Sequence, residues 1–169
     1  MTHENTVDIK KGIEQLKADV RTGFQDIGQG EKNRFDVGLY NELIELLSDS
    51  GVVKFLKEQD FNGSFLHDYI EPLIKFVILW DNPEHEFIDP DIEQKRVELL
   101  KSAKRLANKI ANKTSYINAS VQSVKPRHLL SGPMPDWVKR DAEEINQVAD
   151  DFVEKYDEFV RFAKIKLYS

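Results

Sequence analysis

The chain has 169 residues, enough for one domain with an appended arm, and its 30 acidic and 24 basic side chains give a net charge of −6. It contains no cysteine, which excludes disulfides, thiol catalysis and cysteine zinc sites and is typical of a reducing compartment. Residues 1–11 lack the pattern of a signal peptide, and no apolar run approaches the 20 or so residues that cross a bilayer. We therefore expect a cytoplasmic protein without a membrane span.

Residues 1–33 are predicted to form a helical arm. Apolar side chains recur there at spacings of three and four, which places them in one narrow stripe along an otherwise polar helix. The stripe consists of Ile9, Ile13, Leu16, Val20, Phe24 and Ile27. A narrow stripe is typical of a coiled-coil strand, so we expect the arm to bind a protein, either a second copy or another chain. The alternative is an arm folded back on its own domain. Gly28 and Gly30 are expected to end or bend this helix, with a linker over 29–33.

Residues 34–169 are predicted to form a helical bundle domain, and two short helices open it. The first covers residues 37–47 and ends at the breaker sequence Ser48–Gly51. A further turn or two of helix is expected over 52–56. Asn62–Gly63 then marks a tight turn.

The next two helices are expected to begin at capping signals. Ser64 is a candidate N-cap, although Pro72 inside the following pattern favours a kink or a late start near Glu71. The apolar run 73–80 is predicted to be a buried helix. Asp89–Pro90 supplies the N-cap and first residue of the following helix, whose apolar stripe is interrupted by Arg96.

The last thirty-odd residues hold an apolar stripe that alternates spacings of four and three without a miss, which predicts a long helix buried along one face. Its members are Val138, Ala142, Ile145, Ala149, Phe152, Tyr156, Phe159 and Ala163. Asp136 is the expected N-cap, and residues 114–135 form a long connection of weak periodicity. Trp80 and Trp137 are expected in the core. No strand pattern competes, so the predicted fold class is all-α, a mostly antiparallel helical bundle with an N-terminal helical arm.

The loop Glu84–Asp91 is the densest cluster of metal-ligand side chains, and a metal-dependent enzyme centred on His85 is one possible function. Prolines at both ends favour a loop, which lacks the geometry of a helical zinc motif. The simpler interpretation is that Phe87 and Ile88 fill the core while carboxylates cap the next helix. His67 and Asp68 are adjacent and therefore do not face each other on a helix. We expect no catalytic residues, no cofactor and no bound metal.

Charge is distributed unevenly along the chain. Residues 36–100 carry fifteen acidic and five basic side chains, whereas residues 101–140 carry nine basic and one acidic. Within the basic stretch, Lys101, Arg105 and Lys109 repeat every four residues and would line one helix face, as in proteins that bind nucleic acid or another polyanion. The simpler interpretation is that the acidic and basic stretches pack together and neutralise each other.

Two segments, Phe61–Phe65 and Trp80–Pro90, carry a resemblance to a class of small bacterial helical proteins without an assigned activity. The similarity covers roughly residues 50–165 and implies a bacterial cytosolic helical domain, but it transfers no site residue. The function we favour from the sequence is a non-catalytic protein–protein interaction or oligomerisation module. Polyanion binding through residues 101–140 is the first alternative, and a metal-dependent enzyme using the Glu84–Asp91 loop is the second.

Overall fold

The structure is a computed structural model that describes residues 2–169, without the side chains of 2–5 and 24–27. Five α-helices follow in chain order among these residues: α1 (Thr2–Leu47), α2 (Val52–Glu58), α3 (Glu71–Leu79), α4 (Pro90–Lys113) and α5 (Asp136–Tyr168). Three short strands, β1 (Phe65–Leu66), β2 (Ser115–Tyr116) and β3 (Val121–Ser123), and three 3₁₀ turns complete the fold. The all-α class with an N-terminal helical arm is confirmed, and none of the described helices is long and apolar enough to cross a bilayer.

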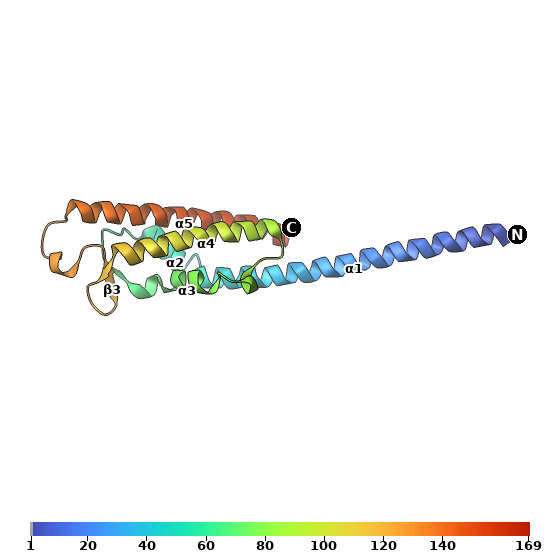
Figure 1. The fold of residues 1–169 in the computed structure, drawn as a ribbon, viewed down its shortest axis with the longest axis horizontal. Helices are drawn as coiled ribbons and strands as arrows, with labels where there is room; N and C mark the ends of the chain where they lie inside the picture. The colour runs from blue at the N-terminus through green and yellow to red at the C-terminus, as the bar shows by residue number, and fades with distance from the viewer. Residues whose placement is uncertain (1) are drawn as a thin grey trace.

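The bundle is built around α4 and α5, which run antiparallel and pack side by side along most of their length (Figure 1). All eight members of the predicted α5 stripe are buried, and Phe152 and Phe159 are fully inaccessible. The short helices α2 and α3 and the C-terminal part of α1 cover the remaining faces of this pair. The 4-3 spacing therefore identified correctly the helix face around which the core forms.

Helix α1 does not break at the glycines, and this corrects the linker predicted over residues 29–33. It continues without interruption from the arm into the bundle, so that its N-terminal part extends far beyond the other helices (Figure 1). A glycine inside a helix costs only about 1 kcal/mol relative to alanine. No glycine in the described chain has a positive φ, so Gly28 and Gly30 do not form the left-handed cap that ends many helices.

The end of α1 and the following turn agree with the sequence. Ser48, just after Leu47, has a φ of 32°, a left-handed conformation that ends the helix at the predicted breaker. The turn at Asn62–Gly63 is closed by a hydrogen bond of 3.0 Å from the Gly63 N–H to the Asp60 carbonyl.

The capping predictions had mixed outcomes. Asp89 caps α4, since its Oδ1 accepts from the N–H groups of Asp91 at 2.9 Å and Ile92 at 3.2 Å. Ser64 does not cap a helix, because the chain first forms β1 and α3 begins only at Glu71, the late start that Pro72 favoured. Asp136 is the first residue of α5 rather than its cap.

A small antiparallel sheet of order β1-β3-β2 is an element that the sequence did not reveal. It pairs Phe65 with Gln122 and Ser115 with Ser123, so the segment expected to be an irregular connection folds partly as a hairpin. Strands of two or three residues are too short to show an alternating pattern, which explains why periodicity missed them.

Two predictions about the core were wrong in part. Trp80 is buried as expected, but Trp137, in the first turn of α5, is 39% exposed. Within the apolar run 73–80, Leu73 and Phe76 are buried while Ile78 and Leu79 lie at the surface. A helix of nine residues that packs on one side leaves its other side exposed, whatever its composition.

The buried phenol of Tyr156 makes the stability of the bundle sensitive to alkaline pH. Burial raises its pKa to about 12, with smaller contributions from Asp49, Tyr40 and Asp157. The folded state therefore holds this proton more tightly than the unfolded chain, where tyrosine titrates near pH 10. The resulting stabilisation is present below about pH 10 and is lost as the pH rises towards about 12.

We expect the free energy of unfolding to fall less steeply between about pH 10 and 12 in Tyr156→Phe than in the natural chain, because phenylalanine has no proton to lose. Urea unfolding at a series of pH values measures this slope. The matched variant Tyr116→Phe, at an exposed tyrosine, controls for the removal of a phenol hydroxyl. Equal slopes for Tyr156→Phe and the natural chain would contradict the assignment.

Candidate functional site

The arm presents an apolar stripe to solvent. Every described side chain over residues 6–23 is exposed. The exposed fractions of Ile9, Ile13, Leu16 and Val20 lie between 46% and 64%. Phe24 and Ile27, the last two predicted members, lie outside the residues whose side chains are described. The structure thus places the first four members along a continuous helix that projects from the bundle (Figure 1).

The side-chain contacts shown within residues 7–23 are local to the helix. Gln15 Nε2 donates to Asp19 Oδ1 at 3.0 Å, and Thr22 Oγ1 donates to the carbonyl of Ala18. Lys17 Nζ lies 3.7 Å from Glu14 Oε1 in an exposed ion pair, which contributes little to stability. These contacts join side chains of one helix and do not cover the apolar stripe.

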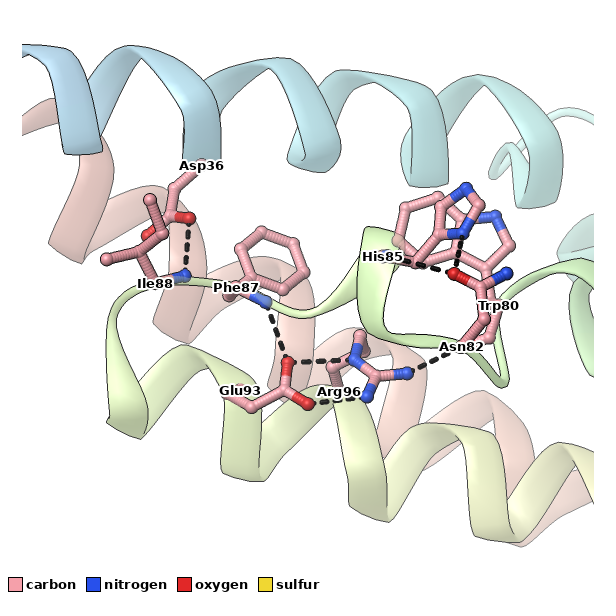
Figure 2. A network of polar contacts seen from close by, with 8 residues as sticks. All are labelled: Asp36, Trp80, Asn82, His85, Phe87, Ile88, Glu93 and Arg96. Atoms are coloured by element: carbon pink, nitrogen blue, oxygen red, sulfur yellow. Dashed lines mark hydrogen bonds and ion pairs between the residues drawn. The ribbon is translucent and has the colours of Figure 1, made fainter.

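Hydrogen bonds of Asn33 and Asp36 hold α1 against the bundle. The Asn33 amide donates to the carbonyl of Leu167 at 3.5 Å. Asp36 is buried, and one of its carboxylate oxygens accepts from the backbone N–H of Ile88 at 2.8 Å (Figure 2). The other accepts from the backbone N–H of Asp89 at 2.9 Å. Two charge-assisted hydrogen bonds to one buried carboxylate fix the point where α1 joins the domain.

Lys166 adds an ion pair near this junction. Its Nζ lies 3.1 Å from Asp89 and 2.9 Å from Asp91, and hydrogen bonds to these carboxylates raise the pKa of Lys166. Partial burial acts to raise the pKa of Asp89, but hydrogen bonds from Ile92, Lys166 and Asp91 outweigh it and hold this pKa below its ordinary value.

The loop Glu84–Asp91 is organised by structural hydrogen bonds (Figure 2). Asn82 Oδ1 accepts from the backbone N–H of His85 at 3.2 Å and lies 2.9 Å from its Nδ1, while the His85 ring packs against Trp80 with centroids 4.4 Å apart. Phe87 is buried as expected, but Ile88 is 46% exposed rather than in the core. In the described part of the chain, no three histidine, aspartate or glutamate side chains converge as metal ligands.

Below this loop lies an ion pair between Glu93 and Arg96 on α4 (Figure 2). Glu93 Oε2 accepts from the backbone N–H of Phe87 at 2.8 Å and from Arg96 Nε at 2.8 Å, and Arg96 also donates to the Trp80 carbonyl at 2.7 Å. Arg96 is only 4% exposed. It does not interrupt the buried face of α4, as the sequence indicated, but belongs to that face and holds the loop against it.

The predicted row of basic side chains on α4 is partly paired. Lys101 and Arg105 are exposed, and no ion pair involves either within the described part of the chain. Lys109, in contrast, lies 3.2 Å from Glu144 on α5. A neighbour of the row, Lys104, lies 2.6 Å from Asp81. The charges of the basic stretch are therefore partly neutralised by packing, whereas Lys101 and Arg105 have no ion-pair partner among the described side chains.

The small sheet brings together a cluster that sequence spacing did not reveal. His67 Nδ1 lies 2.7 Å from Gln122 Oε1 and 3.0 Å from the Tyr116 hydroxyl, and Gln122 Nε2 donates to Thr114 Oγ1 at 3.2 Å. Since the amide nitrogen of Gln122 is used by Thr114, its oxygen faces His67, which favours a proton on Nδ1. The partner of His67 is thus Gln122, 55 residues away, and not the adjacent Asp68.

Comparison of the chain with protein-family models, with curated proteins and with solved structures finds no match.

Proposed function

We propose that this protein is a non-catalytic interaction module of the cytoplasm that associates with protein through the apolar stripe of its arm. The observation that carries the proposal is the exposure of Ile9, Ile13, Leu16 and Val20 on a part of α1 that projects beyond the bundle. Full burial of such a side chain is worth about 1.5–3 kcal/mol. Because roughly half of each is exposed, a partner helix offers on the order of 1 kcal/mol for each one that it covers.

The helix itself supports the same proposal. Gly12, Gly23, Gly28 and Gly30 all lie in the projecting part of α1, and each costs about 1 kcal/mol relative to alanine. Most helical stability in proteins comes from packing of an apolar face rather than from intrinsic propensity. An arm that has this composition and lies away from the bundle gains stability when its stripe is covered.

The test compares proteins retained by three tagged full-length baits in lysate of the native host. We expect the natural chain and the control Ala18→Glu to retain the same protein, because Ala18 lies on the opposite side of the arm from the stripe. Leu16→Glu/Val20→Glu should lose it, since a partner would have to bury two carboxylates. All three substitutions are at exposed arm positions, so the bundle folds equally in each bait.

Two results would overturn this proposal. One is an identical set of retained proteins for all three baits, which would place the interaction outside the stripe. The other is the absence of any specific partner, including an untagged copy of the chain, from every bait.

A further inference from the structure

We infer that the occupant of the stripe is a second copy of this chain, whose arm lies parallel and in register with the first. The inference rests on the proposed function, which requires only that the stripe binds a protein. The inference adds which protein this is and how its arm is oriented. Two features of α1 carry it: the side of the helix on which the stripe lies, and the charges beside the stripe.

The stripe lies on the side of α1 away from the bundle. The bundle-facing side of α1 is defined by its buried residues Asp36, Leu39, Tyr40, Leu43 and Leu47. At 3.6 residues per turn, the stripe positions Ile13, Leu16 and Val20 lie on the order of 160° around the helix axis from that side. Because α1 is unbroken between the two segments, this relation is fixed by the helix itself.

The stripe also ends where the bundle begins. Beyond residue 33, the helix face that carries the stripe is exposed and mostly polar. Its residues there are Arg34, Gly38, Asn41, Glu42 and Glu45. Two arms can therefore pair along the stripe while their bundles stay on opposite outer sides of the pair. A parallel arrangement meets no obstruction from the domains that the arms carry.

The flanks of the stripe carry opposite charges. Lys10, Lys17 and Arg21 lie roughly 90° to one side of the stripe, whereas Asp8 and Asp19 lie roughly 90° to the other. All five side chains are exposed. Glu14, which pairs with Lys17, is one step farther round the helix from the stripe.

This segregation of charge distinguishes the two possible orientations. In a parallel pair of helices, one flank of each helix runs beside the opposite flank of its partner, so the basic flank meets the acidic one. In an antiparallel pair, like flanks meet, and lysine faces lysine. Charges flanking a coiled-coil seam set partner choice and orientation in this way, which selects the parallel homodimer.

The absence of cysteine from the chain allows a direct test by single-cysteine cross-linking. In full-length Ile9→Cys and, separately, Val20→Cys, mild oxidation should produce a disulfide-linked dimer, because each position faces its own counterpart in a parallel, in-register pair. The control Ala18→Cys, on the outer side of the arm, should stay mostly uncross-linked at the same concentration.

No antiparallel alignment gives this result. The two positions are eleven residues apart, so in any antiparallel pair the distances of residues 9 and 20 from their own counterparts add up to at least about 33 Å. A disulfide needs β-carbons about 4 Å apart, so at most one of the two variants would cross-link. Cross-linking of only one variant would overturn the parallel orientation and leave self-association intact.

Cross-linking of neither variant, together with a monomeric natural chain, would overturn the second copy as occupant. The proposed function would still stand if the stripe variant lost a different protein in the bait comparison, so the two failures are distinguishable. As a further check, Lys10→Glu/Lys17→Glu should weaken dimerisation of a parallel pair at least tenfold, because two carboxylates would then replace two ammonium groups on the flank that faces Asp8 and Asp19 of the other copy. In an antiparallel pair the same change replaces lysine facing lysine by glutamate facing glutamate, so dimerisation should stay the same. Unchanged dimerisation would therefore contradict the parallel orientation.

Discussion

Replacing Phe152 by alanine is expected to lower the free energy of unfolding by about 3–5 kcal/mol, the usual cost of deleting a buried aromatic side chain and leaving a cavity. Phe152 lies at the centre of the α5 stripe and is fully buried between α5 and the helices that it packs against. Such a loss is a large fraction of the 5–15 kcal/mol that stabilises a typical domain. Urea-induced unfolding followed by far-UV circular dichroism measures it.

The matched control for this substitution is Phe35→Ala on α1, at a phenylalanine that is 47% exposed. We expect a change within about 0.5 kcal/mol there, as for most surface positions. If Phe152→Ala unfolded at the same urea concentration as the natural chain, the α5 stripe would not be the centre of the core.

Arg96→Met is expected to cost about 3 kcal/mol, because it leaves Glu93 without its charged partner in a mostly buried position. The substitution also removes the hydrogen bond to the Trp80 carbonyl, which holds the loop after α3 against α4. Glu93 retains some access to solvent, so we expect the lower end of the range for buried ion pairs. Urea unfolding again supplies the measurement.

A second variant separates loss of the charge pair from a general packing defect. In Glu93→Gln/Arg96→Met, the amide oxygen still accepts from the Phe87 N–H, and no unpaired charge remains. This double variant should therefore be more stable than Arg96→Met alone. Lys101→Met, at an exposed position on the same helix, should change little. A double variant less stable than Arg96→Met would show that the unpaired charge of Glu93 does not cause the loss of stability.

The parts of the fold that the sequence predicted are those that a long periodic pattern determines. The α5 stripe repeats often enough that only one buried face is consistent with it, and Asp89–Pro90 is a local capping signal that requires no distant partner. The helical character of the arm followed from the same kind of pattern. These features depend on neighbours within one helix, so the sequence alone contains the information.

Other features depend on contacts between distant residues. Arg96 looked like an interruption because its partners, the Trp80 carbonyl and Glu93, are visible only once the loop is folded over α4. The sheet that joins Phe65 to Gln122 has strands too short for any periodicity. Glycine is a weak signal for a helix end, and α1 continues through Gly28 and Gly30.

The candidate site was predicted only in part. Spacing placed the apolar stripe on one face of the arm, and the structure shows its described members exposed. What the sequence did not give is the relation between this face and the bundle, which requires knowing that α1 is one continuous helix. Because α1 is continuous, the apolar face of the arm is directed away from the bundle of its own chain.

The most direct test of the account is the mass of the full-length natural chain in sedimentation equilibrium over a range of concentrations, beside Leu16→Glu/Val20→Glu and Ala18→Glu. We expect the natural chain and Ala18→Glu to approach twice the 19.6 kDa chain mass as the concentration rises. The stripe variant should remain at the mass of a single chain with its bundle folded. A natural chain that stays monomeric at every concentration, or a stripe variant that dimerises as well as Ala18→Glu, would contradict self-association through the arm.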